Sequence, residues 1–237
     1  AQGLLAGINA ARLCAGDDPW TLDRTEAYLG VMVDDLITQG ASEPYRMFTS
    51  RAEFRLQLRA DNADLRLTEK GLAAGVVGAE RRRTFEARRQ ALAAASDLLE
   101  SLSATAEQLK AAGIPTKGHG TRRTALAVLA QPEATPERLR LLWPEVADLD
   151  PGVMQQIAID RQYEGYLARQ QRDIEATRRD EHLRLPAGLD YGRLSGLSTE
   201  LREKLAAVRP ETLGQAGRIP GMTPAALTLL YRHVRRG

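Results

Sequence analysis

Between residues 80 and 102, Phe85, Leu92 and Leu99 recur at intervals of seven residues, and Leu102 extends the series. Residues seven positions apart lie on one face of an α-helix, because seven residues make almost two turns. Residues 152–182 show a second pattern of this kind, with apolar side chains at helical spacing along a helix of roughly 45 Å. These two long amphipathic helices commit the chain to a mainly helical fold.

The composition agrees with this expectation. Apolar residues make up 43% of the 237 residues, which is enough for a core of ordinary size. Alanine and leucine dominate them, aromatic residues reach only 5%, and β-branched residues rarely cluster. We therefore predict a mostly α, multi-helix fold. The turn-forming residues of LPAGLDYGRLSGLS predict a boundary near residue 186, so we expect an opening segment over 1–17, a helical domain over 18–186 and a small helical bundle over 187–237.

The charge balance gives no general attraction to polyanions. The formal net charge is only +2, so a nucleic-acid partner would need a local basic patch. Cys14 is the only cysteine, which excludes an intramolecular disulfide and most metal sites and fits a reducing compartment. No apolar run approaches the roughly 20 residues that cross a bilayer, and we expect a cytoplasmic protein. The chain opens AQGLLAGINAARL, without Met and inside a helical apolar pattern, so we expect it to be part of a longer protein.

Residues 43–71, EPYRMFTSRAEFRLQLRADNADLRLTEKG, are rich in arginine, and an acidic or amide residue stands near almost every one. Ser50 followed three positions later by Glu53 forms a capping box, which predicts a helix from Arg51. The alternation of apolar residues would also suit a strand, but we favour the helix. Thr68 is expected to cap another helix further along.

In the predicted helix, Arg51, Arg55 and Arg59 share one face, because they are spaced four residues apart. Guanidinium groups about 6 Å apart match successive phosphates of a nucleic-acid strand. The acidic neighbours support a rival interpretation, an internal network of arginine–carboxylate pairs that holds segments together. These neighbours are Glu53, Asp61 and Asp64. The residues alone leave both interpretations open.

A second pattern lies in LGQAGRIPGMTPAALTLLYRHV, residues 213–234. A helix ending near Ala216 is followed by Pro-Gly and by a helix with Pro224 at its start, as in the helix-hairpin-helix of nucleic-acid-binding proteins, whose hairpin N–H groups hold a phosphate. Pro-Gly between helices is also ordinary punctuation. Upstream, we expect Ser198 to cap one helix of the bundle and Pro210 to start the next.

The chain shows no catalytic constellation. His119, His182 and His233 are scattered, and there is no HExxH, GxSxG, GxGxxG or phosphate-binding GxxxxGK[ST]. His119 lies in a Gly-flanked loop near two arginines and could meet an anion, but we favour the interpretation that it is a solvent-exposed loop histidine. If the chain belongs to an enzyme, we expect the chemistry to lie elsewhere.

The segment GVMVDDLITQGASEPYRMFTSRAEFRLQLRADNADLRLTEKG, residues 30–71, resembles the signature segment of the MnmG family, also called GidA. AQGLLAGINAAR resembles the closing helix of that family's FAD-binding domain, and IPGMTPAALTLLYRHV resembles its C-terminal end. The resemblance therefore runs from the first residue to the last. It implies that the chain is the C-terminal region of a flavoprotein, with residues 1–17 ending the FAD-binding domain.

The resemblance also implies a function. The family works with the GTPase MnmE and uses FAD and NADH to install a carboxymethylaminomethyl or aminomethyl group at C5 of the tRNA wobble uridine. It acts as a homodimer, and its helical C-terminal region serves tRNA binding and contact with MnmE. Neither FAD nor NADH is expected to bind this chain tightly, because the dinucleotide-binding glycine motif is absent from it.

Residue roles follow from the same resemblance. Gln2 and Gly3 would place a helix N-terminus near the flavin. The expected tRNA contacts are Arg46, Arg51, Arg55, Arg59, Asn62 and Arg66. The expected contacts with the partner protein are Arg218, Pro220, Gly221, Pro224 and Leu230. Two other functions stay open, a stand-alone helix-hairpin-helix module that binds nucleic acid and a structural region for dimerisation.

Overall fold

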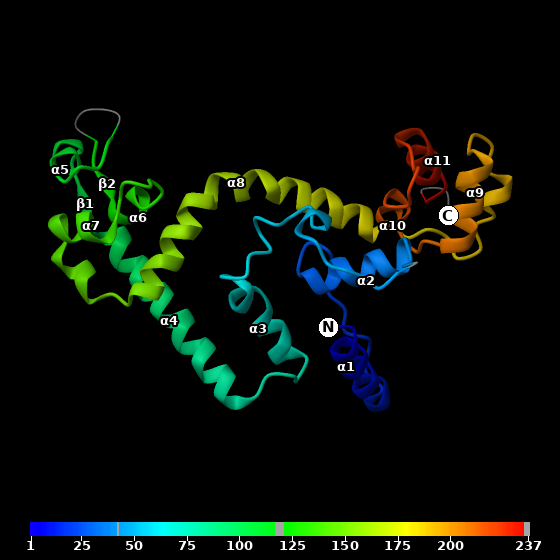
Figure 1. The fold of residues 1–237 in the computed structure, drawn as a ribbon, viewed down its shortest axis with the longest axis horizontal. Helices are drawn as coiled ribbons and strands as arrows, with labels where there is room; N and C mark the ends of the chain where they lie inside the picture. The colour runs from blue at the N-terminus through cyan, green and yellow to red at the C-terminus, as the bar shows by residue number, and fades with distance from the viewer. Residues whose placement is uncertain (42, 117–120, 235–237) are drawn as a thin grey trace. The chain divides into compact units, whose positions relative to one another are not determined.

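The computed structural model describes residues 1–41, 43–116 and 121–234, and for residues 181–182 it describes the backbone only. Helices dominate these residues, which confirms the predicted mostly α fold (Figure 1). Internal contacts divide the chain into two units, unit 1 with residues 1–58 and 170–237, and unit 2 with residues 59–169. The boundaries at residues 17 and 186 stay predictions. None of the described helices is long and apolar enough to cross a membrane.

Unit 2 is built around α4 (Ala79–Ser101) and the first part of α8 (Pro151–His182), the two long helices that the apolar spacing predicted. Figure 1 shows the shorter elements gathered near the end of α4. These are β1 (Ser103–Ala104), α5 (Ala106–Ala111), β2 (Arg123–Thr124), α6 (Ala125–Val128), α7 (Pro136–Leu142) and the 3₁₀-helix η2 (Pro144–Asp148). The two short strands pair antiparallel, and one apolar core joins α4, these elements and α8 through Leu99, Leu109, Val128, Leu139 and Ile157.

Unit 1 begins with α1 (Gln2–Ala15) and α2 (Tyr28–Thr38) and ends in a terminal bundle, residues 183–234. The bundle contains η3 (Tyr191–Arg193), α9 (Thr199–Val208), α10 (Leu213–Gly217) and α11 (Pro224–Val234). Figure 1 shows the three α-helices near one another. Its core is apolar and includes Leu201, Leu205, Ala216, Ile219 and Leu230. A smaller cluster packs α2 against the arginine-rich segment and α8 through Val31, Phe54, Leu58 and Ile174.

The helix predicted from Arg51 is wrong. Only a 3₁₀-helix, η1 (Thr49–Arg51), forms there, and Ala52 is extended with φ −98° and ψ 119°. Glu53 does not close the capping box, because its carboxylate accepts a hydrogen bond from Arg24 instead. The same guanidinium takes the carbonyl oxygen of Arg51, which a helix would have used.

Two predicted helix starts are also wrong. Helix α3 (Ala63–Ala73) begins five residues before Thr68, which is buried within it, so packing outweighs the local capping signal. Helix α10 begins at Leu213 rather than after Pro210, because the Thr212 side chain accepts the N–H of Gln215 at 3.1 Å. Two other predicted helix starts are confirmed, since Ser198 caps α9 and Pro224 starts α11.

Candidate functional site

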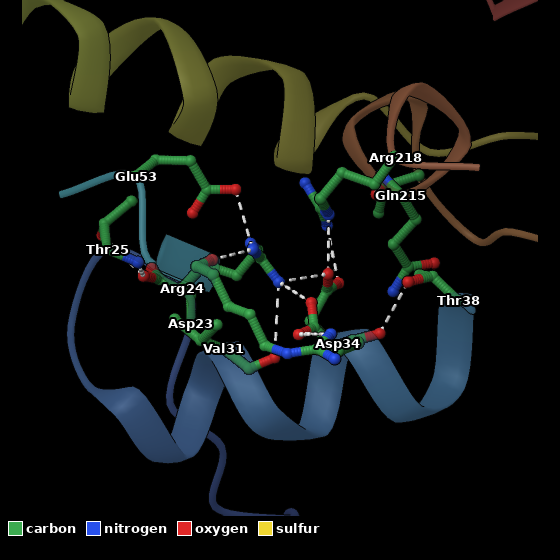
Figure 2. Close-up of polar contacts among 12 residues, drawn as sticks. Asp23, Arg24, Thr25, Val31, Asp34, Thr38, Glu53, Gln215 and Arg218 are labelled. Carbon is green, nitrogen blue, oxygen red and sulfur yellow. Dashed lines mark hydrogen bonds and ion pairs between the residues drawn. The ribbon is translucent and has the colours of Figure 1, made fainter. Parts of the chain in front are cut away.

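Arg24 lies at the centre of a buried polar cluster in unit 1 (Figure 2). Its side chain is only 7% exposed. Nη1 donates to Asp34 Oδ2 at 3.0 Å and to Asp35 Oδ1 at 2.7 Å. Nη2 donates to Glu53 Oε1 at 2.7 Å. The guanidinium also donates to the carbonyl oxygens of Val31 and Arg51, so it binds the loop before α2, the helix itself and the arginine-rich segment together.

The charge of Arg24 is strongly held. Burial by itself lowers the pKa of this guanidinium, but the hydrogen bonds that it donates to Glu53 and Asp35 and the charges of the nearby carboxylates outweigh this effect. The pKa of Arg24 therefore lies above its ordinary value. The two buried aspartates consequently keep a permanent positive partner.

Asp34 has a second cationic partner, Arg218, which follows α10 in the terminal bundle. Arg218 Nε donates to Asp34 Oδ2 and Nη2 donates to Oδ1, both at 2.6 Å. Such a bidentate pair is among the strongest polar contacts in proteins. Figure 2 shows Arg24 and Arg218 approaching the same carboxylate. The terminal bundle is thereby anchored to α2.

Asp35 joins a third arginine to the cluster. Its Oδ2 accepts a hydrogen bond from the Tyr45 hydroxyl at 2.8 Å and lies 3.4 Å from Arg51 Nη1. The Arg51 guanidinium also lies 5.0 Å from the centre of the Tyr45 ring. Burial, followed by the hydrogen bond to Asp35, raises the pKa of Tyr45 to about 12. Arg51 is therefore committed in part to the internal network, which the acidic neighbours had suggested.

The sequence reasoning missed Arg24, Asp34 and Asp35. The available signal was the pair of adjacent aspartates inside the apolar helix VMVDDLI, because two buried carboxylates need cations nearby. A close approach completes the arrangement, since a Cβ on Gly30 would lie 2.1 Å from the backbone oxygen of Asp23. Only glycine lets the loop that carries Arg24 approach α2 so closely.

Two other arginines of the arginine-rich segment, Arg46 and Arg55, are exposed to solvent. Arg46 is exposed, and its guanidinium lies 5.2 Å from the centre of the Phe48 ring, which is itself 48% exposed. Arg55 is exposed and makes no hydrogen bond or ion pair with any residue that the structure describes. These two cations and one aromatic ring can receive an external anion or base.

Arg59 belongs to unit 2 and is almost buried, with 10% of its side chain exposed. It pairs with Asp61 at 3.1 Å and with Asp160 at 2.5 Å, and its guanidinium lies 5.0 Å from the centre of the Tyr163 ring. Burial lowers the pKa of Arg59, but the hydrogen bonds to Asp61 and Asp160 more than offset it, so the pKa is raised. Arg59 is thus held internally, and no helix aligns it with Arg51 and Arg55 in a row.

The other predicted contacts of unit 2 bind each other. Arg66 Nε donates to Asn62 Oδ1 at 2.8 Å, and Arg66 Nη2 donates to the carbonyl oxygen of Arg59 at 3.3 Å. Asp64, expected to hold a neighbouring arginine, lies 3.3 Å from Arg88 of α4 instead. Together these contacts attach the start of α3 to the elements around it within unit 2.

In the hairpin, the predicted partner contacts divide into exposed and internal residues. Pro220, Gly221 and Pro224 are exposed. The Pro220 carbonyl oxygen accepts a hydrogen bond from Lys204 at 2.8 Å, and Gly221 has φ 91°, which makes the tight turn possible. Arg218 is occupied by Asp34, and Leu230 is fully buried in the bundle core. Leu230 therefore cannot contact a partner directly, and it can support a docking surface only by packing in the core below it.

The remaining predicted residues lie apart from this cluster. Gln2 and Gly3 occupy the first turn of α1 and are exposed. His119 lies outside the described residues, so its predicted meeting with an anion has no structural account. Among the residues that the structure describes, no group of His, Cys, Asp and Glu is arranged to hold a metal ion.

Comparison with known proteins identifies related sequences and folds. Residues 79–171 match the family model "tRNA modifying enzyme MnmG/GidA C-terminal helical domain", and residues 173–237 match "tRNA modifying enzyme MnmG/GidA C-terminal helical bundle". The tRNA uridine 5-carboxymethylaminomethyl modification enzyme MnmG of Granulibacter bethesdensis is 47% identical over 236 residues, which cover 100% of this chain and 38% of that protein.

Two solved structures have the same fold. They are crystal forms II and I of Aquifex aeolicus GidA, both 34% identical, with TM-scores of 0.78 and 0.75. The match covers 98% of this chain and 37% of the first structure, and 100% and 36% for the second. The chain thus spans little more than a third of the length of these relatives.

Proposed function

Because the chain belongs to the MnmG/GidA family of tRNA-modifying enzymes and matches its C-terminal helical regions, we propose that it binds tRNA and recruits the GTPase MnmE. The complete enzyme would act in the cytoplasm as a homodimer and install a (carboxymethyl)aminomethyl group at C5 of the wobble uridine. FAD and NADH would supply the redox chemistry. This chain would supply recognition.

The residues fit a minor role at the flavin. Gln2 and Gly3 are exposed at the start of α1, and a Cβ on Gly3 would meet nothing within 4 Å, so a cofactor has room to approach the backbone there. We propose that this turn forms one wall of a flavin site. If Gln2→Ala leaves the flavin content of the complete enzyme unchanged, Gln2 has no part in that site.

The observation that carries the tRNA proposal is that Arg46, Phe48 and Arg55 of the arginine-rich segment are all exposed, and that the Arg46 guanidinium lies over the Phe48 ring. An unpaired guanidinium suits a phosphate, and an exposed ring suits a base, so the group combines the two contacts that RNA-binding surfaces use. Arg51 is half-exposed and would contribute less. Arg59, Asn62 and Arg66 would act by holding the neighbouring backbone in place, because their side chains bind each other and nearby carboxylates.

The test is tRNA binding by fluorescence anisotropy at several salt concentrations. Arg46→Gln with Arg55→Gln should weaken binding, and each lost phosphate contact should reduce the slope of log K against log salt by about 0.7 to 0.9. Arg140→Gln is the matched control, since this exposed arginine of α7 carries the same charge. If the loss of binding free energy in the double variant is no more than twice the loss in the control, which removes one charge rather than two, the effect is general electrostatics and the proposed contacts are wrong.

We propose that MnmE contacts the exposed hairpin around Pro220, Gly221 and Pro224. Deleting residues 196–237 should abolish capture of MnmE and spare tRNA binding. Since that deletion also removes the partner of Asp34, Pro224→Glu provides a milder test, because an acidic residue is favoured in the first turn of a helix. Retained capture by this variant would move the contact elsewhere. Loss of tRNA binding alone on deletion would favour the helix-hairpin-helix module.

A further inference from the structure

The terminal bundle contains a cavity of about 700 Å³ between residues 184–192 and the C-terminal end of α9. Leu185, Leu189 and Tyr191 contribute apolar wall, and Arg184 and Arg209 also line it. Its volume lies within the range of small-molecule sites, about 300 to 1,000 Å³. The proposed tRNA and MnmE contacts do not use this cavity.

The backbone of Arg209 is strained. Its φ of 48° and ψ of 60° place it in the left-handed region, and it is the one described residue other than glycine with a positive φ. Glycine is the usual residue at such a helix end, because any L side chain costs energy there. The chain therefore keeps an arginine where glycine would be less strained. Strained residues of this kind concentrate at functional sites.

Both arginines line the cavity and are exposed, and their charges have no internal compensation. Neither guanidinium makes a hydrogen bond or ion pair with any side chain or backbone group in residues 1–41, 43–116 or 121–234 whose position is described. Burial raises the pKa of the Tyr191 phenol, and the positive charge of Arg209 opposes this shift. An arginine at a helix C-terminus also complements the helix dipole. The helix dipole can explain a positive charge at Arg209, which ends α9, but it does not explain the positive charge at Arg184.

Two acidic residues also line the cavity. Asp190 is occupied, since its carboxylate accepts the N–H of Gly192 at 2.9 Å and lies 3.4 Å from Arg193. Glu211 is exposed and offers an acceptor. The cavity thus combines two cations, an apolar wall and one carboxylate. A bare anion would use only the first of these, whereas a nucleotide would use all three.

We propose that this cavity binds a ribonucleotide unit. Arg184 and Arg209 hold its phosphate, Leu185 and Tyr191 pack against its base, and Glu211 accepts a hydrogen bond from a ribose hydroxyl. A free nucleotide and one nucleotide of an RNA chain share this chemistry. In the second case the inference rests on the tRNA binding proposed above.

The experiment is a titration of the full chain of 237 residues with AMP, followed through the backbone amide signals of Gly188 and Gly192 by NMR. Saturable shifts are expected in the unaltered protein. Arg209→Gly and Arg184→Gln should each weaken binding about tenfold, the usual effect of losing a charge-assisted hydrogen bond. Arg193→Gln is the control, because it removes the same charge from an exposed residue outside the cavity lining.

Arg209→Gly also separates binding from folding. Glycine relieves the left-handed strain, so the melting temperature should stay unchanged or rise while affinity falls. Equal weakening by Arg193→Gln would overturn the proposal. So would a lower melting temperature that accounts for the lost affinity.

The source of the nucleotide is distinguished by repeating the measurement with tRNA. If AMP shows no saturable binding but Arg209→Gly weakens tRNA binding more than Arg193→Gln does, the ligand is a nucleotide within RNA. If AMP binds and tRNA affinity is unchanged, the ligand is a free nucleotide. If AMP does not bind and the two variants affect tRNA equally, the proposal is wrong. Failure of the unaltered protein to bind tRNA would overturn the proposed tRNA function, and the AMP titration alone would then decide the cavity.

Discussion

Replacing Arg24 with Met removes the charge from the centre of the buried network and keeps a side chain of similar length. Asp35 is affected most, because its side chain is only 4% exposed and loses a 2.7 Å contact. Asp34 keeps its bidentate pair with Arg218. Glu53 is about half exposed, so the loss of its contact costs little.

These contacts set the magnitude. Removing one partner of a buried ion pair costs about 3 to 5 kcal/mol, because the other charge stays buried without compensation. Since Asp34 retains Arg218 and Asp35 retains the Tyr45 hydroxyl, we expect a value near the lower end, about 3 kcal/mol for Arg24→Met. Arg24→Lys keeps the charge but loses the planar fork, so its cost should be intermediate.

Urea unfolding measures this loss in unit 1. The chain has two tryptophans, Trp20 in unit 1 and Trp143 in the core of unit 2, so a Trp143→Phe background makes fluorescence report on Trp20. Arg193→Met is the control, because that side chain is 89% exposed and should cost almost nothing. A loss below about 1 kcal/mol for Arg24→Met would refute the argument, since that is the size of one ordinary hydrogen bond.

Three further perturbations test other contacts. The pKa of Tyr45 is about 12 in the folded protein against 10 in the unfolded chain, which predicts a stability contribution that is complete below pH 10 and lost as pH rises toward 12. The Tyr45→Phe variant should therefore lose less stability between pH 10 and 12 than the unaltered protein does, and equal losses would contradict this prediction. Gly30→Ala should destabilise by about 1 to 3 kcal/mol in urea because its Cβ meets the Asp23 backbone, whereas Gly7→Ala, with open space, should not. Leu230→Ala should cost about 2 to 5 kcal/mol by leaving a cavity in the bundle core, and a smaller loss in thermal unfolding would show that the core collapses around it.

The long helices were predictable from sequence because their signal repeats. Apolar residues at helical spacing over more than twenty positions predict α4 and α8 closely, and single capping residues such as Ser198 predict the start of α9. The helix predicted from Arg51 also rested on a capping signal, but it does not form. Its signal was one capping box of two residues, and a tertiary contact from Arg24 took both the Glu53 carboxylate and the Arg51 carbonyl.

The candidate site shows the same division. The sequence by itself determined a helical chain of this family and a segment in which arginines and acids are interleaved. The sequence was compatible with two kinds of partner for those arginines, external phosphates or internal carboxylates. Only the tertiary structure decided that Arg59 is held inside and that Arg51 is partly engaged by Asp35, while Arg46 and Arg55 are exposed.

The physical reason is the range of the interactions. Helix periodicity and capping depend on residues within a few positions of each other, so both can be recognised in the amino-acid sequence. The pairs that organise the site join distant positions, as Arg218 and Asp34 do across 184 residues. Which carboxylate an arginine takes depends on which groups are buried together, and burial is set by the packing of whole helices.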